Sequence, residues 1–118
     1  NGDKHLKDLT NTKMRLIQRI TEVVAPLRII LFGSAARQEM ATDSDLDLLI
    51  VVPDGVPRRK TAQDIYMKLL DFEIPVDIVV ATEKDLELYG DNFSLVYYSA
   101  LRDGQEIYVA PELQSRVS

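Results

Sequence analysis

Three aspartates and a Gly-Ser pair are the residues of this chain whose types and spacing best suit chemistry. Asp45 and Asp47 are two residues apart at the start of a segment that predicts a β-strand over residues 45–52. Side chains two positions apart on a strand share one face, with Cα atoms roughly 6.5–7 Å apart. Two carboxylates so close repel each other unless a cation neutralises them, so the pair predicts a shared metal ion. Mg²⁺ suits such an oxygen-only site, because one or two carboxylates with substrate phosphates commonly hold it.

Asp77 is the third candidate carboxylate. It is the lone charge in the run from Ile74 to Val80, which predicts a strand over residues 76–80. We expect it to be buried there, and a buried carboxylate without a partner would be costly, so it should have a partner cation. If this strand lies beside the strand at 45–52, Asp77 joins Asp45 and Asp47 on one face and completes a three-carboxylate metal site.

Gly33 and Ser34 follow a short apolar run that predicts a buried strand over residues 28–32. A glycine at a strand-to-helix turn lets the backbone approach a ligand closely, and the amides that start the next helix attract phosphate oxygens. Ser34 adds a hydroxyl. A plain turn with Ser34 as helix N-cap explains an isolated Gly-Ser pair more simply. Likewise, residues 43–47 taken alone could be a polar turn before an edge strand.

The other elements are expected to build one small sheet that positions these residues. Apolar residues three and four positions apart predict an amphipathic helix over residues 6–24, closed by Pro26. Thr61 with Asp64, and Thr82 with Asp85, have the spacing of capping boxes and predict helix starts. The expected order is a helix at 6–24, a strand at 28–32, a helix at 35–40, a strand at 45–52, a helix from 61 to 72, a strand at 76–80, helices at 82–89 and 93–101, and a strand at 106–109. This order predicts an α/β or α+β domain with a small mixed sheet of about four strands covered by helices.

Composition and charge exclude several classes of protein and site. The 118 residues suit one domain over 1–118, with an N-terminal helix at 6–24 and the main body at 27–110. No cysteine and a single histidine, His5, exclude disulfides, thiolate sites and a zinc site built on histidines. No apolar run is long enough to cross a membrane, and the first residues lack a secretory signal, so we expect a cytoplasmic protein. A net charge of −5 disfavours nucleic acid as a partner, and we interpret the basic cluster at 58–60 as a solvated turn.

The candidate residues together resemble the signature of the DNA polymerase beta-like nucleotidyltransferase superfamily. Gly33-Ser34 is followed, after ten residues, by Asp45-Leu46-Asp47, and Asp77 stands where the third carboxylate is expected. The strings at 31–37 and 44–48 are similar to those of minimal nucleotidyltransferase (MNT) domains, the MntA-type antitoxins of HEPN/MNT toxin–antitoxin systems. Gln38 departs from the pattern, because many such sequences have glycine after the arginine.

The resemblance implies a nucleotidyltransferase-like fold and a Mg²⁺-dependent transfer of a nucleoside monophosphate, AMP from ATP, to a hydroxyl. It implies two Mg²⁺ ions, with the metal-binding and catalytic roles falling to Asp45, Asp47 and Asp77 and the phosphate contacts to Gly33, Ser34 and Arg37. Asp77 is the natural acceptor of the hydroxyl proton. The resemblance also implies the acceptor, a tyrosine of a partner HEPN toxin, which would make this chain an antitoxin that modifies its toxin.

Other interpretations stay open at this point. The chain could be a module that binds a nucleotide or a toxin without catalysis. A metal-dependent glycosyltransferase could also use an Asp-x-Asp pair, but that leaves Gly33-Ser34 and Asp77 unexplained. Tyr97, Tyr98 and Tyr108 are expected to fill the core or an interface between copies, so a homo-oligomer is a further alternative.

Overall fold

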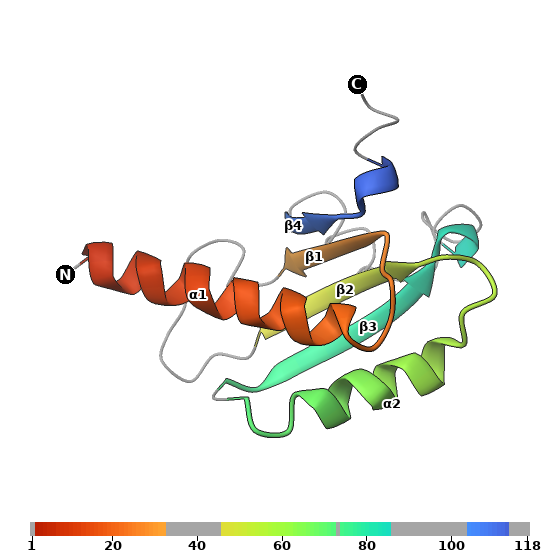
Figure 1. The fold of residues 1–118 in the computed structure, drawn as a ribbon, viewed down its shortest axis with the longest axis horizontal. Coiled ribbons are helices and arrows are strands. Elements are labelled where there is room, and N and C mark those ends of the chain that lie inside the picture. The colour runs from red at the N-terminus through yellow and green to blue at the C-terminus, as the bar shows by residue number, and fades with distance from the viewer. Residues whose placement is uncertain (1, 33–45, 73, 86–103, 114–118) are drawn as a thin grey trace.

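The computed structural model describes residues 2–32, 46–72, 74–85 and 104–113, with only the backbone described for residues 2–9. Its elements are α1 (Gly2–Thr21), β1 (Arg28–Phe32), β2 (Leu46–Val52), α2 (Arg58–Lys68), β3 (Val76–Thr82) and β4 (Gln105–Val109). Figure 1 shows α1 and α2 lying across the same side of the sheet. None of the helices in these ranges is long and apolar enough to span a membrane.

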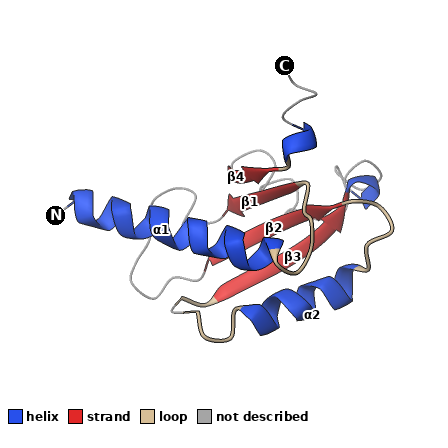
Figure 2. Cartoon of the chain, viewed as in Figure 1, coloured by secondary structure: helices blue, strands red, loops and turns tan. Residues whose placement is uncertain are grey.

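The four strands form one mixed sheet in the order β3-β2-β1-β4. β1 is antiparallel to both β2 and β4, whereas β2 and β3 are parallel and are connected through α2 (Figure 2). The α+β class and the small mixed sheet expected from the sequence are therefore confirmed. Hydrophobic periodicity alone could not give this strand order.

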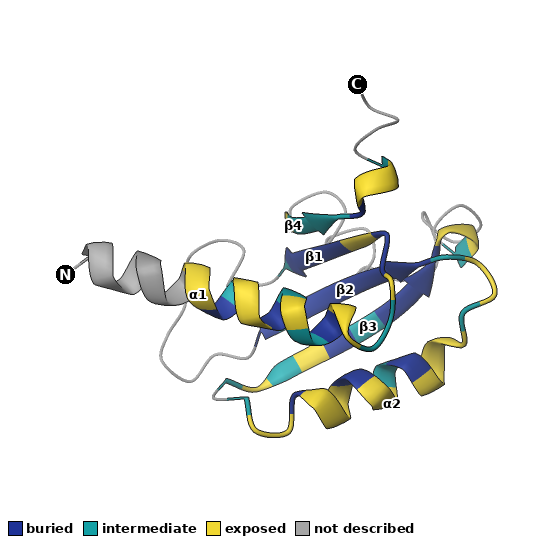
Figure 3. Cartoon of the chain, viewed as in Figure 1, coloured by how far each residue is buried: buried dark blue, intermediate teal, exposed yellow. Residues whose placement is uncertain are grey.

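β2 is the centre of the core, and Figure 3 shows it almost entirely buried. On one face, Leu48 and Ile50 belong to the same buried cluster as Leu16 and Ile20 of α1. On the other face, Leu49 packs in a second cluster of buried residues. A strand buried on both faces reads as a continuous apolar run, which explains why its sequence alternates only at its start.

The first helix differs from its expected bounds of 6–24. α1 begins at Gly2 and ends at Thr21, and the chain turns at residues 22–23. Val23 and Val24 pack against the core from this turn. Their apolar spacing therefore continued the helical pattern although the helix itself had ended.

The capping box expected at Thr61 is wrong. α2 begins three residues earlier at Arg58, with Pro57 at the N-cap and no side-chain cap. Thr61 is buried on the inner face of the helix, four residues before the buried Ile65. The basic cluster at 58–60 is thus the first turn of a helix and not a loop. The helix ends at Lys68, so Phe72 packs from the turn that follows.

The second capping box is confirmed. The Asp85 backbone N–H donates to the Thr82 Oγ1 at 3.1 Å, and the Thr82 N–H donates to an Asp85 carboxylate oxygen at 3.1 Å. The residues at 83–85 are helical, as this motif predicts. The helices expected at 35–40 and 93–101, and the rest of the one at 82–89, lie outside the described residues.

Candidate functional site

Asp47 and Asp77 lie side by side on adjacent strands. β2 and β3 are parallel, and Asp47 is the register partner of Asp77. Neighbouring strands are about 4.8 Å apart, and register partners point to the same face of the sheet. The described fold therefore brings together two carboxylates that are thirty residues apart in the sequence.

These two aspartates belong to the face of the sheet opposite α1 and α2. Leu46 and Leu48, on either side of Asp47, pack in the cluster that includes α1. The side chains of a strand alternate between its two faces, so Asp47 points the other way. The same alternation applies at Asp77, because Ile78 packs in that same cluster.

The expected burial of Asp77 is wrong. Asp77 is exposed and Asp47 is partly buried. β3 is an edge strand, and only its later residues, from Ile78 onward, are largely covered. An exposed carboxylate keeps its hydration, so burial does not require a partner cation for Asp77. The argument for a cation comes instead from the close placement of two like charges.

The start of β2, the start of β3 and the end of β1 meet at one end of the sheet. The last residue of β1, Phe32, is the register partner of Asp47. The Leu46 N–H donates to the Pro75 carbonyl at 2.9 Å and ties the two strand starts together. In the sequence, Gly33 directly follows Phe32 and Asp45 directly precedes Leu46.

The remaining candidate residues, Gly33, Ser34, Arg37 and Asp45, lie outside the described residues. Within the ranges that are described, no three metal-binding side chains gather. Asp47 and Asp77 nonetheless fit a hard divalent cation, because they offer carboxylate oxygens from two neighbouring strands on one face. These two residues would hold Mg²⁺ at this end of the sheet.

Tyr66 is a residue near the site whose role the sequence did not reveal. Its hydroxyl accepts a hydrogen bond from the backbone N–H of Ile78 at 2.9 Å. Ile78 directly follows Asp77, so Tyr66 of α2 holds the β3 backbone next to that carboxylate. The helical spacing predicted only an apolar contact for Tyr66, and no local pattern indicates a hydrogen bond to an edge strand.

The basic cluster at 58–60 lies at the other end of the sheet, where β2 and β3 finish. Arg58 forms an ion pair with Asp85 at 2.9 Å, and Lys60 forms one with Asp64 at 3.3 Å. Burial acts to raise the pKa of Asp85. The hydrogen bonds from Thr82 and the charge and hydrogen bond of Arg58 together outweigh burial, so the pKa of Asp85 lies below its usual value. Two of the three cations are thus paired within the chain.

Known proteins share the sequence pattern and the fold of this chain. The sequence profile of the nucleotidyltransferase domain family matches residues 13–106. A search of curated protein sequences found no match.

Solved structures share the fold at low sequence identity. One is a chain of a toxin–antitoxin complex with AMP-PNP, at a TM-score of 0.61 and 16% identity over 88% of this chain and 78% of that chain. Another comes from a complex of a tri-AMPylated HEPN toxin of Shewanella oneidensis with an MNT antitoxin, at a TM-score of 0.55 and 15% identity over 92% of this chain and 78% of that chain.

A third is the spectinomycin adenyltransferase of Enterococcus faecialis with ATP and spectinomycin. Its TM-score is 0.60 at 14% identity, and the match covers 86% of this chain and 58% of that chain. Identities this low establish the fold, whereas the family profile adds evidence from the sequence itself. Since that profile extends from α1 into β4 and includes both paired aspartates, the chain belongs to the nucleotidyltransferase domain family.

Proposed function

We propose that this chain transfers AMP from ATP to a hydroxyl group of a partner protein in a Mg²⁺-dependent reaction. The observation that carries the proposal is the register pairing of Asp47 with Asp77 on one face of the sheet. Membership of the nucleotidyltransferase domain family supports the reaction class. The neighbours with AMP-PNP and with ATP support a nucleoside triphosphate as substrate.

In this proposal the candidate residues divide into metal ligands and phosphate contacts. Asp45, Asp47 and Asp77 hold two Mg²⁺ ions, and Gly33 and Ser34 position the outer phosphates. Arg37 is a further candidate for contact with these phosphates. The bound cations supply Lewis-acid stabilisation of the charge on the phosphates.

In the transfer step, one bond to phosphorus forms as another breaks, and a residue of the site accepts the proton. The acceptor oxygen forms a bond to the α-phosphorus while the bond from that phosphorus to the pyrophosphate oxygen breaks. The hydroxyl proton passes to Asp77, and pyrophosphate leaves. The exposed position of Asp77 suits this role, because the acceptor must come within hydrogen-bond reach of the carboxylate.

The acceptor we propose is a tyrosine of a HEPN toxin, so that the chain acts as an antitoxin. Its support is the fold shared with chains of toxin–antitoxin complexes, one of which contains a tri-AMPylated HEPN toxin. The alternative is an antitoxin that binds its toxin or a nucleotide without catalysis.

Calorimetry of ATP binding tests the proposal. The chain is titrated with ATP in Mg²⁺ and in EDTA, beside the Asp47→Ala/Asp77→Ala double variant. Asp64→Ala is the matched control, because Asp64 is an exposed carboxylate on α2 away from the site. We expect Mg²⁺-dependent binding in the unaltered chain and in Asp64→Ala, and its loss in the double variant. If no nucleoside triphosphate binds the unaltered chain with Mg²⁺, the proposal is wrong.

Labelled ATP then separates catalysis from binding. With the HEPN toxin as acceptor, Asp77→Asn should reduce AMP transfer about 100-fold or more, the usual contribution of a proton acceptor. A toxin neutralised equally well by Asp77→Asn, without transfer of label, would establish the non-catalytic alternative.

A further inference from the structure

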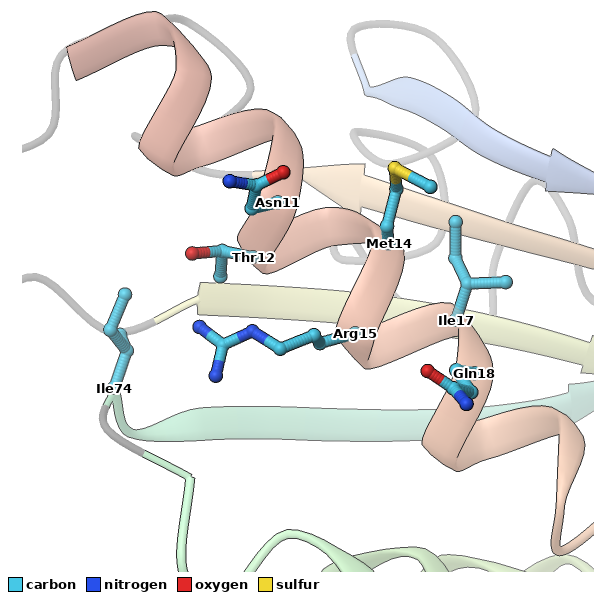
Figure 4. A pocket seen from close by; sticks show the side chains of 7 residues that line it. All are labelled: Asn11, Thr12, Met14, Arg15, Ile17, Gln18 and Ile74. Carbon is cyan, nitrogen blue, oxygen red and sulfur yellow. The ribbon is translucent and has the colours of Figure 1, made fainter. Parts of the chain in front are cut away.

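Asp77 lies near the start of an edge strand, where backbone frays easily unless a further contact holds it. In the described sheet β3 has β2 on one side only, and Asp77 is its second residue. Just before the strand, Ile74 and the stretch of α1 from Asn11 to Gln18 line an open groove of about 1020 Å³ (Figure 4). The described part of α1 therefore covers this strand start only loosely.

The hydrogen bonds of β3 show which of its backbone groups face the edge. The Pro75 carbonyl accepts from the Leu46 N–H, so it turns toward β2. Backbone groups of successive residues in a strand face opposite sides, so those of Asp77 also turn toward β2 and those of Ile78 turn outward. The Thr82 N–H, four residues after Ile78, agrees with this alternation because it donates to a carboxylate outside the sheet. The Ile78 N–H is therefore an edge group, with no strand beside it in the described sheet.

A single peptide unit joins Asp77 to Ile78, between β2 and α2. This unit is planar and trans, so its carbonyl points toward β2 while its N–H points away from β2. The Tyr66 hydroxyl accepts a hydrogen bond from this N–H at 2.9 Å. The Cα atom of Asp77 lies in the same plane, so fixing the plane limits where the Asp77 side chain can point. Tyr66 thus acts on the direction of the Asp77 carboxylate through the backbone.

α2 gives this hydroxyl a fixed point of attachment. Thr61 and Ile65 are buried on the inner face of the helix. Ile65 packs in the same buried cluster as Ile78 and Val80 of β3. Tyr66 follows Ile65 and is 40% exposed, so it lies at the rim of this packed face. Water can satisfy the Ile78 N–H in place of the hydroxyl, but a water molecule is not anchored to α2 and does not hold the strand.

We infer that Tyr66 is a positioning residue for Asp77 in nucleotidyl transfer. This inference rests on the proposed function, in which Asp77 holds Mg²⁺ and accepts the hydroxyl proton. Both tasks need the carboxylate within about 0.5 Å of its working position, and a misplacement of about 1 Å can reduce a rate about 100-fold. The Tyr66 hydroxyl keeps the peptide of Asp77 in place while substrate and acceptor bind and leave.

AMP transfer from labelled ATP to the HEPN toxin tests the inference in Tyr66→Phe, which keeps the ring and loses the hydroxyl. We expect the rate at saturating ATP and Mg²⁺ to fall about tenfold, as when a group that orients a metal ligand is lost, and KM for ATP to change by less than about twofold. Tyr108→Phe is the control for loss of a tyrosine hydroxyl. Thr82→Ala is the control for a loss of stability at the other end of β3. Both controls should keep the rate of the unaltered chain.

A double-mutant cycle with Asp77→Asn separates positioning from a general structural role. If Tyr66 acts through Asp77, adding Tyr66→Phe to Asp77→Asn should change the remaining rate by less than about twofold, because that carboxylate is already gone. The loss of stability caused by Tyr66→Phe should persist in both backgrounds. An equal fall in rate in both backgrounds would mean that Tyr66 does not act through Asp77, and would overturn the inference.

The same rates distinguish this inference from the proposed function. If Asp77→Asn reduces transfer but Tyr66→Phe transfers AMP as fast as the unaltered chain, the inference is wrong and the proposed function stands. If the unaltered chain transfers no AMP to the toxin, the proposed function fails and the inference fails with it.

Discussion

At the scale of single residues, the paired aspartates should reduce the stability of the fold that holds them. Asp47 and Asp77 are register partners, and like charges placed directly opposite in a sheet are destabilising by about 0.2–1 kcal/mol. Asp77→Asn removes this repulsion. We expect the free energy of unfolding of this variant, measured by urea denaturation in EDTA, to exceed that of the unaltered chain by an amount in this range.

Mg²⁺ with ATP should reverse that order, because the cation neutralises the pair in the unaltered chain only. An Asp77→Asn variant less stable in EDTA would mean that Asp77 has a favourable structural partner. That outcome would weaken the assignment of the pair to a metal site.

The hydroxyl of Tyr66 gives a second prediction for a single residue. Tyr66→Phe removes the acceptor of the Ile78 N–H, and a typical hydrogen bond contributes about 0.5–1.5 kcal/mol. We expect Tyr66→Phe to lower the free energy of unfolding by an amount near the lower end of this range, because Tyr66 is 40% exposed and water can replace the hydroxyl. Urea denaturation measures the loss, and faster hydrogen exchange of the Ile78 amide locates it.

Tyr108→Phe is the matched control for Tyr66→Phe. Its ring packs against both buried clusters, and within the described ranges no hydrogen bond of its hydroxyl is found. Equal losses in the two variants would mean that the Tyr66 hydroxyl does not support β3.

The sequence was enough to predict part of the candidate site, and the features that it could not predict depend on how the strands and helices pack. Residue type and alternation were enough to predict Asp47 and Asp77 as candidates on strands. Alternation could not show that β3 is an edge strand, so the exposure of Asp77 was missed. The contact of Tyr66 with Ile78 was missed because it depends on how α2 lies beside β3, which no local pattern encodes.

At the scale of elements, the capping box after β3 should contribute measurably to stability. Thr82→Ala removes the oxygen that accepts the Asp85 N–H, and loss of such a cap typically costs about 1 kcal/mol. Urea denaturation at pH 7 checks this value. Thr61→Ser is a useful contrast, because Thr61 makes no cap in α2. This substitution should change the free energy of unfolding only through packing.

The same capping box should make the free energy of unfolding depend on pH. The pKa of Asp85 is lowered in the folded state, so its ionised form stabilises the fold at pH values above its unfolded pKa of about 4. That contribution is lost as the pH falls through the lower folded pKa. Asp85→Asn should therefore be less stable than the unaltered chain at pH 7, and the gap should narrow below about pH 4. A gap that persists at pH 2 would show that the charge of Asp85 is not its source.

The elements also show where sequence patterns succeed. The strand at 28–32 has the bounds expected of it, and the strands at 45–52, 76–80 and 106–109 are each found within one or two residues. Short apolar runs define β1 and β2 because most of their residues are buried, whereas β4 is only partly covered and is defined by its pairing with β1. The start of α2 was misplaced because a Thr and an Asp three residues apart also occur inside helices, where a small threonine can fill the buried face.

At the scale of the whole molecule, ligand binding should raise thermal stability. A ligand present at 100 times its Kd adds about 2.7 kcal/mol to the free energy of unfolding. For a chain of 118 residues this corresponds to a rise in Tm of several degrees or more. Thermal denaturation should show the rise with ATP and Mg²⁺ together and lose it in EDTA. The Asp47→Ala/Asp77→Ala variant should show no rise, whereas an equal rise in that variant would place the nucleotide elsewhere.

Folding of the β2-α2-β3 crossover is what brings the two aspartates together. Asp47 and Asp77 are thirty positions apart in the sequence, and closing such a loop is entropically unfavourable. The apolar register partners that follow, Leu48 with Ile78 and Ile50 with Val80, close it during folding against the repulsion of the acids. In the proposed function, a cation would therefore meet two ligands already side by side and would not have to order the chain, so the packing of the core would favour its binding.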